Sequence, residues 1–436
     1  MTALALVLVT LAGVPDTERE SAAARLVSAG TRYALSALGP VTVSAAHFIA
    51  ALIFLHTLPR AAFGEFSFLI IVSAFCLSFC GALFAPPIAR DAGRPNGMAE
   101  AERHTLFKAN AAFTAVAAVA VSLLLFFGGA DPLLASIFGL YGGTMSARWF
   151  ARCWTYADGR AARVLASDLA YSGTVTVGLF GLLFLHRVTV WSAAVALLIA
   201  SSAGLAAFHR AFWRQQLQGI IVGQLKPFLL TWRELSSWAV LGVAMSEATV
   251  NAHAYLVTFI SGPHAFALLA IGTLLMRPVS LVLAALPDME RPLMSRMIRE
   301  GKTAGAFRIV KEFRTAAGAI WLGAVLLAGV LLLWFPSLIV KREYPLAEVA
   351  VVVSISAAIM ALRAVRTPEA VLLQAAGEFR KLAGVGIWSG FISLGMTFML
   401  LMMFGPLAAL CGILTGDIVA TERTFALWRI WKAEHA

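Results

Sequence analysis

The chain has 436 residues, of which 60% are hydrophobic and only 13% are charged, and its mean hydropathy is +0.84. This composition excludes an ordinary soluble domain and is typical of a membrane protein. The 34 Lys and Arg outnumber the 23 Asp and Glu, which gives a formal net charge of +11. A basic patch on a soluble face would indicate nucleic-acid binding, so the meaning of the charge depends on where these residues lie.

Twelve apolar stretches are long enough to span a bilayer, which takes about 17–25 residues for a hydrocarbon core roughly 30 Å thick. In chain order they are residues 35–58, 66–86, 111–127, 133–150, 168–185, 190–208, 237–260, 265–286, 316–335, 346–362, 382–404 and 407–426. The sequence therefore predicts an all-α integral membrane protein with about 12 transmembrane helices.

The connections between these stretches alternate in charge. Of the 34 Lys and Arg, 29 lie at the N-terminus, at the C-terminus or in loops after even-numbered spans, and 4 lie in loops after odd-numbered spans. Cytoplasmic loops collect Lys and Arg, so both termini are predicted to face the cytoplasm. The same bias explains the net positive charge, and we expect no nucleic-acid partner.

The twelve spans divide evenly about a polar, amphipathic segment. The predicted organisation is a cytoplasmic N-terminal segment, a six-helix bundle, a cytoplasmic linker and a second six-helix bundle, at residues 1–34, 35–208, 209–236 and 237–436. The first 13 residues are apolar but too short to span, and they lack the basic start of a signal peptide. Two halves with the same orientation predict a parallel repeat, related by an axis along the membrane normal.

Weak internal similarity supports two pseudo-symmetric bundles. Residues 59–64, after the first span, resemble residues 262–267, after the seventh. Residues 157–160, after the fourth span, resemble residues 375–378, after the tenth. Both similarities fall at matching places in the two halves.

The short connections exclude several classes of membrane protein. No external loop is large enough for the catalytic site of a membrane glycosyltransferase or polymerase, and no Gly-rich phosphate loop indicates a primary pump. No cluster of His, Cys, Asp or Glu has metal-ligand spacing. We therefore expect a transporter rather than an enzyme, with neither a cofactor nor a metal.

Three segments resemble polysaccharide flippases, which are the O-antigen and exopolysaccharide transporters of the multidrug/oligosaccharidyl-lipid/polysaccharide flippase superfamily. Residues 55–66 resemble the junction after helix one of that family, although His56 stands where the family often has Arg. Residues 265–278, with Leu286-Pro287 and Met294-Ser295-Arg296, are similar to helix eight and its loop, and residues 372–377 resemble the turn after helix ten.

The resemblance implies a function in surface polysaccharide or lipopolysaccharide biosynthesis. Such a flippase carries a polyprenyl-pyrophosphate-linked oligosaccharide from the cytoplasmic to the outer leaflet of the bacterial inner membrane by alternating access. Its partners would be this lipid-linked oligosaccharide, the membrane lipids and other polysaccharide assembly proteins. The site would be a hydrated, partly cationic cavity between the two halves.

Arg277 is the main candidate binding residue. It lies about ten residues from either end of span 265–286, which is roughly 15 Å deep at 1.5 Å per residue. A charge at that depth costs at least about 2.5–3.5 kcal/mol on insertion scales, so it should face a cavity or a partner. The resemblance implies that it contacts the pyrophosphate, which a guanidinium binds through bidentate hydrogen bonds.

A structural ion pair is the alternative for Arg277. Glu247 lies at similar depth in the preceding antiparallel span, and Asn251 follows one turn later on the same face. A pair between Glu247 and Arg277 would neutralise both charges. Both roles hold if the substrate phosphate competes with Glu247 for the guanidinium.

Two further polar residues in the spans are candidates for the site, and a third is expected to lie outside it. Asp417 in the last span is either a cavity residue or a structural one, and His47 in the first span is a possible proton carrier or hydrogen-bonding partner. Asp168 lies near the predicted cytoplasmic end of span five, where we expect a solvated or helix-capping role.

Two other functions are compatible with the layout. A cation-coupled drug or metabolite antiporter of the same superfamily would have a carboxylate-dominated cavity, often with an acidic residue in span one, whereas span 35–58 contains no Asp or Glu. A membrane assembly subunit without a pore would not need Arg277, Glu247 and Asp417 inside the membrane. The deep arginine therefore favours an anionic substrate.

Overall fold

The computed structural model describes residues 38–92, 98–339 and 343–435. A first helix, Leu38–Thr57, precedes the labelled ones. The labelled helices of the first half and the linker are α3 (Arg60–Ala92), α4 (Glu100–Phe127), α5 (Pro132–Ala157), α6 (Ala161–Phe184), α7 (Val190–Ala206), α8 (Arg210–Val222), α9 (Phe228–Thr231) and the π-helical turn η2 (Trp232–Ser236). Those of the second half are α10 (Ser237–Ser261), α11 (Pro263–Leu275), α12 (Arg277–Arg299), α13 (Thr303–Trp334), α14 (Pro336–Ile339), α15 (Leu346–Ala375), α16 (Phe379–Phe404), the 3₁₀ turn η3 (Pro406–Ala408) and α17 (Ala409–His435).

Local capping fixes several of these ends. The Asp131 carboxylate accepts hydrogen bonds from the amides of Leu133 and Leu134, at 2.9 and 3.2 Å, and so satisfies donors that the start of α5 leaves free. Thr189 and Ser192 form a reciprocal capping box at the start of α7. These turns keep the connections short and the neighbouring helices antiparallel.

Eleven of the twelve predicted spans fall on one helix each, and span 265–286 falls on the bent pair α11 and α12. Within the described residues, seven helices are long and apolar enough to cross a membrane, or up to nine when two bent pairs each count as one span. The predicted spans on α5, α10 and α17 are not among these. The all-α, multi-pass architecture is confirmed. The predicted segment 1–34 lies outside the described residues.

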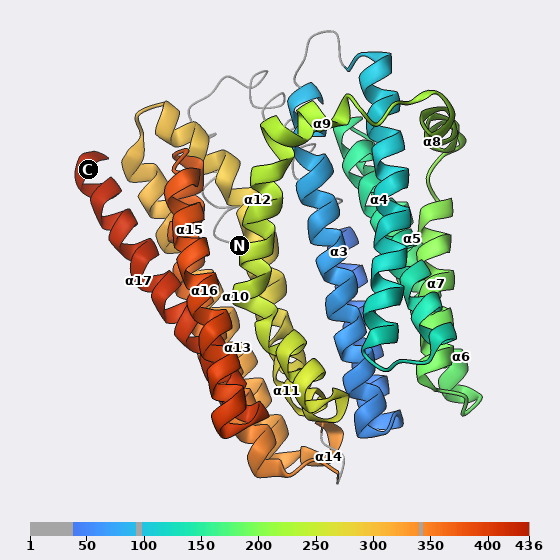
Figure 1. The fold of residues 1–436 in the computed structure, drawn as a ribbon. Coiled ribbons are helices and arrows are strands. Elements are labelled where there is room, and N and C mark those ends of the chain that lie inside the picture. Colours follow the sequence, from blue (N-terminus) through green and yellow to red (C-terminus); the bar gives the residue numbers. More distant parts are fainter. Residues whose placement is uncertain (1–37, 93–97, 340–342, 436) are drawn as a thin grey trace, which may run out of the picture.

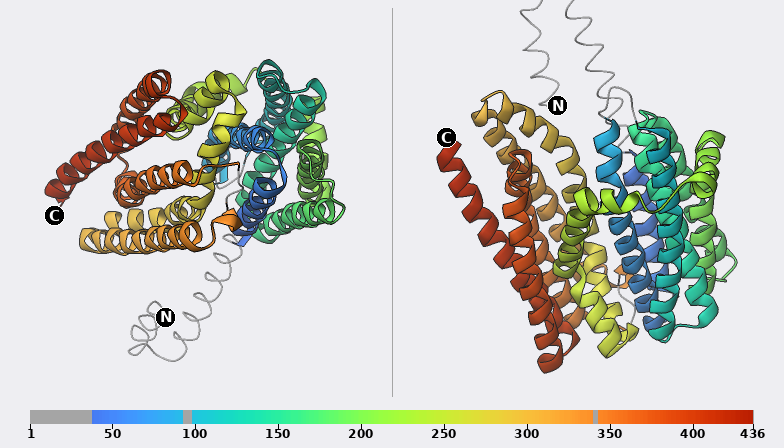
Figure 2. Two further views of the ribbon diagram at one scale, coloured as in Figure 1. Left: turned by 90° about the horizontal axis from the view of Figure 1, so that it is seen from below. Right: turned by 45° about the horizontal axis from the view of Figure 1, so that its top comes forward.

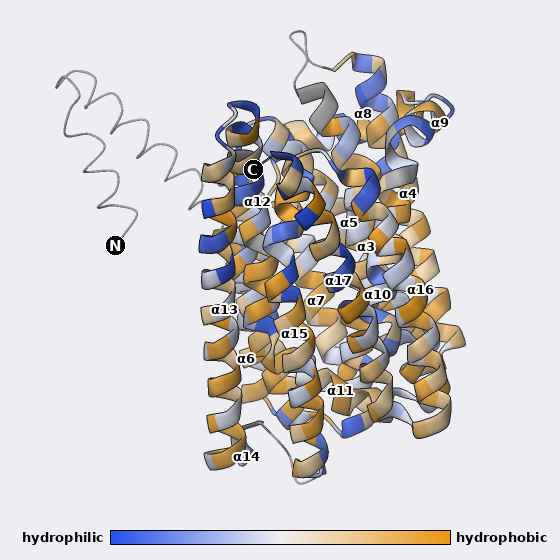
Figure 3. Cartoon of the chain, turned by 90° about the vertical axis from the view of Figure 1, so that its left-hand side faces the viewer, coloured by the Kyte–Doolittle hydropathy of each residue, from blue (hydrophilic) through white to orange (hydrophobic). Residues whose placement is uncertain are grey.

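The helices alternate in direction, so that the basic connections come to one end of the molecule (Figure 1). This end, which we call the basic end, carries α8, α9, the end of α12 and the end of α17. Figure 3 shows hydrophilic residues gathered there, whereas the outer faces of the long helices are hydrophobic. α8 bends by 99° from α7 within the predicted linker. Which side of the membrane the basic end faces stays a prediction.

The helices form two groups side by side, one from each half of the chain (Figure 2). At the end away from the basic end, the two halves touch through the two turns that resemble each other in sequence. Arg60 Nε donates to the backbone carbonyl of His264 at 3.2 Å, and the Arg60 guanidinium lies 5.0 Å from the centre of the Tyr344 ring. A Cβ on Gly64 would collide with the carbonyl of Pro263. The two similar turns, one from each half, are in contact, and this agrees with a repeat axis that runs between the halves. The predicted domain boundaries stay predictions.

Close helix approach inside the first half depends on Gly139 and Gly143 of α5. A Cβ on Gly139 would collide with Ser122 and with the Ala118 carbonyl of α4, and a Cβ on Gly143 would lie 3.0 Å from the Ala118 side chain. Small residues let membrane helices pack closely in this way.

We expect Gly139→Val to lower the melting temperature of the purified protein by several degrees, because overpacking against a fixed backbone carbonyl costs about 1–3 kcal/mol. Gly173→Val in α6 is the matched control, since nothing lies within 4 Å of a Cβ placed there. Thermal unfolding in one detergent compares the two. An equal effect of both variants would contradict the close α4–α5 packing.

Candidate functional site

A pocket of about 320 Å³ lies between the two halves. The first half contributes residues of helix Leu38–Thr57 and of α3, and the second half contributes residues of α10, α11, α12, α15 and α17. The polar lining residues are His47, Ser67, Asn251, His253, Thr273, Arg277, Ser280, Ser356 and Arg363. Among the described lining residues there are two arginines and no Asp or Glu.

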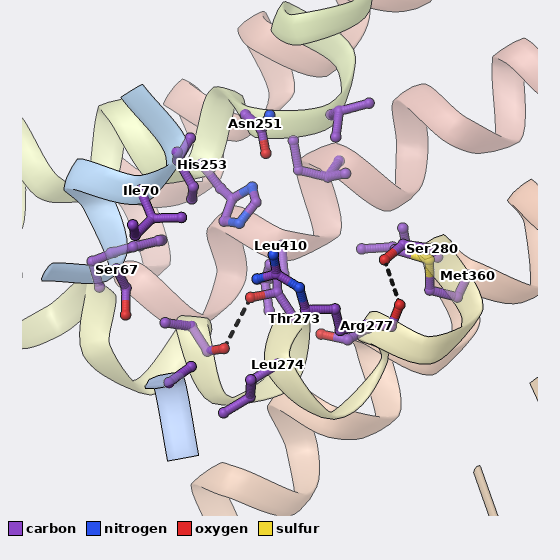
Figure 4. A pocket seen from close by; sticks show the side chains of 18 of the residues that line it. Ser67, Ile70, Asn251, His253, Thr273, Leu274, Arg277, Ser280, Met360 and Leu410 are labelled. Carbon is purple, nitrogen blue, oxygen red and sulfur yellow. Dashed lines mark hydrogen bonds between the residues drawn. The ribbon is translucent and has the colours of Figure 1, made fainter. Parts of the chain in front are cut away.

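A bend in the membrane presents Arg277 to this pocket. α11 and α12 meet at 59°, with Met276 between them. Pro278 has no amide hydrogen, and its ring excludes the carbonyl of residue 274 from a regular helix, so a proline here breaks the span. Arg277, the first residue of α12, points from the bend toward the side where Ser67 and His253 lie (Figure 4).

The Arg277 guanidinium forms no hydrogen bond or ion pair with the residues that the structure describes. Its backbone carbonyl accepts a hydrogen bond from Ser280 Oγ at 2.8 Å, which holds the first turn of α12 (Figure 4). A cation at this depth needs a polar surrounding or a counterion. The position of Arg277 on the lining therefore leaves its charge available to a ligand.

Glu247 does not pair with Arg277 among the described residues. Instead, the Asn251 amide donates to a Glu247 carboxylate oxygen at 2.6 Å, one turn apart on α10. Asn251 lines the pocket and Glu247 does not. The structural pair that the sequence left open as an alternative is thus not formed in this conformation.

Asp417 holds an arginine pair instead of lining the pocket. It is fully buried in α17 and accepts a hydrogen bond from Arg363 Nε at 2.9 Å, and the same carboxylate oxygen lies 2.8 Å from Arg363 Nη2. Arg366 Nη2, one turn along α15, lies 3.1 Å from its other oxygen. Arg363 lines the pocket, whereas Asp417 and Arg366 are not among its lining residues. The cluster carries two positive charges and one negative charge.

Asp168 has the equivalent arrangement in the first half. It is fully buried and pairs with Arg148 and Arg152, which lie one turn apart on α5. The expectation of a solvated or capping Asp168 was wrong, because Arg148 within the apolar stretch and Arg152 on the continuation of α5 beyond it both pair with Asp168 inside the bundle. Spans four and ten thus each place two arginines around a buried aspartate.

His47 connects the first of these clusters to the pocket. The His47 Nε2 atom lies 2.8 Å from the Tyr171 hydroxyl, and Tyr171 lies 3.1 Å from the Tyr141 hydroxyl. The Arg148 guanidinium stacks 4.6 Å from the centre of the Tyr171 ring. His47 is therefore a hydrogen-bonded residue on the pocket wall, at the end of a polar chain from Asp168.

Arg363 is the site residue that sequence reasoning missed. The apolar run of its span ends at residue 362, so Arg363 and Arg366 were counted with the following loop, whereas α15 continues to Ala375. The available signal was their spacing of three residues, which places both on one helix face, opposite a lone intramembrane aspartate. The structure thus brings together Arg277, Asn251, His47 and Arg363, and leaves Glu247 and Asp417 outside the lining.

No family model and no curated protein matches the chain. Among solved structures, an inward-facing multidrug resistance MATE family transporter of the MOP superfamily matches with a TM-score of 0.65 and 15% identity, over 92% of this chain and 98% of that one. The chain has the fold of MATE transporters. An outward-facing MATE transporter matches with a TM-score of 0.61 and 12% identity, over 93% and 95% of the two chains. A structure of MATE in the straight conformation matches with a TM-score of 0.61 and 14% identity, over 93% of this chain and 96% of that one. At this identity the similarity concerns the fold alone, and the polysaccharide flippase family stays a prediction.

We expect Asp417→Asn to destabilise the protein by roughly 3–5 kcal/mol, since it leaves two largely buried guanidiniums without their counterion. The matched control is Glu312→Gln, which removes an exposed partner of Arg308 and should cost less than about 1 kcal/mol. The melting temperatures of both variants in detergent measure the difference. Equal melting temperatures would show that the Asp417 cluster does not support the second half.

Proposed function

We propose that the chain is a membrane transporter for an anionic substrate, and that this substrate is a polyprenyl-pyrophosphate-linked oligosaccharide moved from the cytoplasmic to the outer leaflet. The observation that carries the proposal is the charge of the pocket, which has Arg277 and Arg363 on its described lining and no carboxylate. An anion that enters this pocket can pair with two arginines, whereas the described lining offers a cationic drug no acidic group to bind.

The chemistry suits a phosphate ester. Guanidinium binds phosphate oxygens through two parallel hydrogen bonds, and such charge-assisted bonds are roughly twice as strong as neutral ones. Arg277 stands at the first turn of α12, where the helix dipole adds positive potential. Asn251, Thr273 and Ser280 add polar groups to the lining. Binding and release complete the cycle, and no covalent bond is broken.

The size of the pocket bears on how such a substrate is held. At about 320 Å³, it is at the lower end of ligand pockets, which run from about 300 to 1,000 Å³. It accommodates the linking phosphates but not a whole oligosaccharide, so the sugars need a further separation of the halves. The fold is compatible with this, since solved structures of the fold include inward-facing and outward-facing forms, and rocking of two halves is a general route to alternating access.

A cation-coupled drug or metabolite antiporter is the second candidate. The solved structures described above are multidrug resistance transporters, and this similarity favours the antiporter over a saccharide flippase. At 12–16% identity it concerns the fold alone. The apolar part of the pocket, with Phe63, Phe66 and Phe266, would suit a drug. The charge of the lining and the class of the fold thus favour different substrates, and one experiment separates them.

We expect a strain without the gene to accumulate completed lipid-linked repeats and to lose surface glycan, because the substrate stays in the cytoplasmic leaflet. The wild-type gene should rescue both, and Arg277→Ala at equal expression should rescue less than a tenth of the glycan. Arg308→Ala is the control, since that arginine lies on the surface, paired with Glu312, and should rescue fully.

The opposite outcome identifies the antiporter. Unchanged lipid intermediates and surface glycan, together with altered tolerance to drugs or metabolites, would contradict the flippase. In that case Arg277→Ala should change drug tolerance rather than glycan content.

A further inference from the structure

The second arginine of the pocket has a structural setting that points to ligand binding. Arg363 and Arg366 share one carboxylate, and their side chains are 13% and 19% exposed. Two guanidiniums on one buried aspartate leave one positive charge uncompensated within the cluster. An uncompensated charge in the membrane interior is costly unless water or a ligand meets it.

Of the two arginines, Arg363 is the one whose charge a ligand in the pocket can reach, because Arg363 lines the pocket and Arg366 does not. Asp417 binds Arg363 through Nε and Nη2. A guanidinium has five N–H donors, and the two on Nη1 take no part in this contact. Arg363 belongs to the lining, and its contact with Asp417, which is not a lining residue, fixes the direction of its side chain. Arg366 binds the same aspartate without reaching the lining, so the two arginines have different surroundings.

Arg277 and Arg363 come from different elements and are held in different ways. Arg277 projects from the broken helix α11–α12 and has no ion pair among the described residues, whereas Arg363 projects from α15 and is anchored by Asp417. Both line one pocket in which the described residues include no competing carboxylate. A ligand with two linked anionic groups satisfies both cations at once, and a ligand with a single anionic group satisfies only one.

We propose that Arg363, positioned by Asp417, is a second anion contact of the pocket and binds, together with Arg277, the two phosphate groups of a diphosphate-linked substrate. This rests on the proposed transport of an anionic substrate and deepens it, because it accounts for a diphosphate rather than a monophosphate linkage. Asp417 holds Arg363 in place but does not touch the substrate, so it is a positioning residue.

Binding of inorganic pyrophosphate and inorganic phosphate to the purified protein in nanodiscs tests the assignment. We expect wild type to bind pyrophosphate at least tenfold more tightly than phosphate. Arg363→Ala should weaken pyrophosphate binding at least tenfold, leave phosphate binding within threefold and remove the preference. Arg363→Lys, which keeps the charge but loses the bidentate geometry, should be intermediate.

Arg366→Ala is the matched control. Removal of either arginine leaves Asp417 paired with the other, so both variants keep a neutral buried pair and are expected to fold. Arg366→Ala should bind pyrophosphate within threefold of wild type. Equal loss in Arg363→Ala and Arg366→Ala, or no loss in Arg363→Ala, would overturn the assignment of Arg363.

The outcomes for Arg277 separate this inference from the proposed function. Loss of pyrophosphate binding in Arg277→Ala with full binding in Arg363→Ala would refute the second contact and keep the anion site. If the wild-type protein binds neither pyrophosphate nor phosphate, and the strain without the gene has unchanged lipid-linked intermediates, both the second contact and the proposed function are refuted.

Discussion

The cost of a charge inside the membrane organises this molecule. Asp168 and Asp417 are both fully buried, and a lone carboxylate in that position would be prohibitive. Each one is compensated by two arginines of a neighbouring helix, from α5 and from α15. Charges that are satisfied in this way tie helices together within a half. The Arg277 guanidinium, which has no carboxylate partner in the described part of the chain, is on the pocket that both halves line.

The sequence predicted the helices and their alternation because both follow from simple solvent physics. Apolar runs of bilayer length and the uneven distribution of Lys and Arg need no knowledge of packing. The site was predicted only in part. Arg277 and His47 stood out as polar residues within apolar runs. Arg363 did not, because α15 extends thirteen residues beyond its apolar run. The partners of Asp168 and Asp417 depend on tertiary packing, which no local pattern shows.

Fold and pocket chemistry carry different information about function. The fold is that of multidrug resistance transporters, but folds host many functions and the site decides among them. Here the described lining pairs aromatic residues with two arginines and omits carboxylates. A ligand with an apolar part and an anionic group matches the aromatic residues and the arginines together. A lipid-linked phosphate is a ligand of this kind. The same aromatic surface alone would suit a drug, so the arginines are what separate the two substrates.

The distribution of ion pairs also has a consequence for biogenesis. Arg148 and Asp168 belong to the first half, and Arg363 and Asp417 to the second. The aromatic contacts of Phe68, in contrast, reach across to Tyr255 and Phe266. A half emerging from the ribosome can therefore neutralise its buried aspartate on insertion, while the aromatic part of the surface that will contact its partner meets lipid tails, which apolar rings tolerate. Synthesis of the second half then adds a cluster of its own, so that neither Asp168 nor Asp417 needs a cation from the other half.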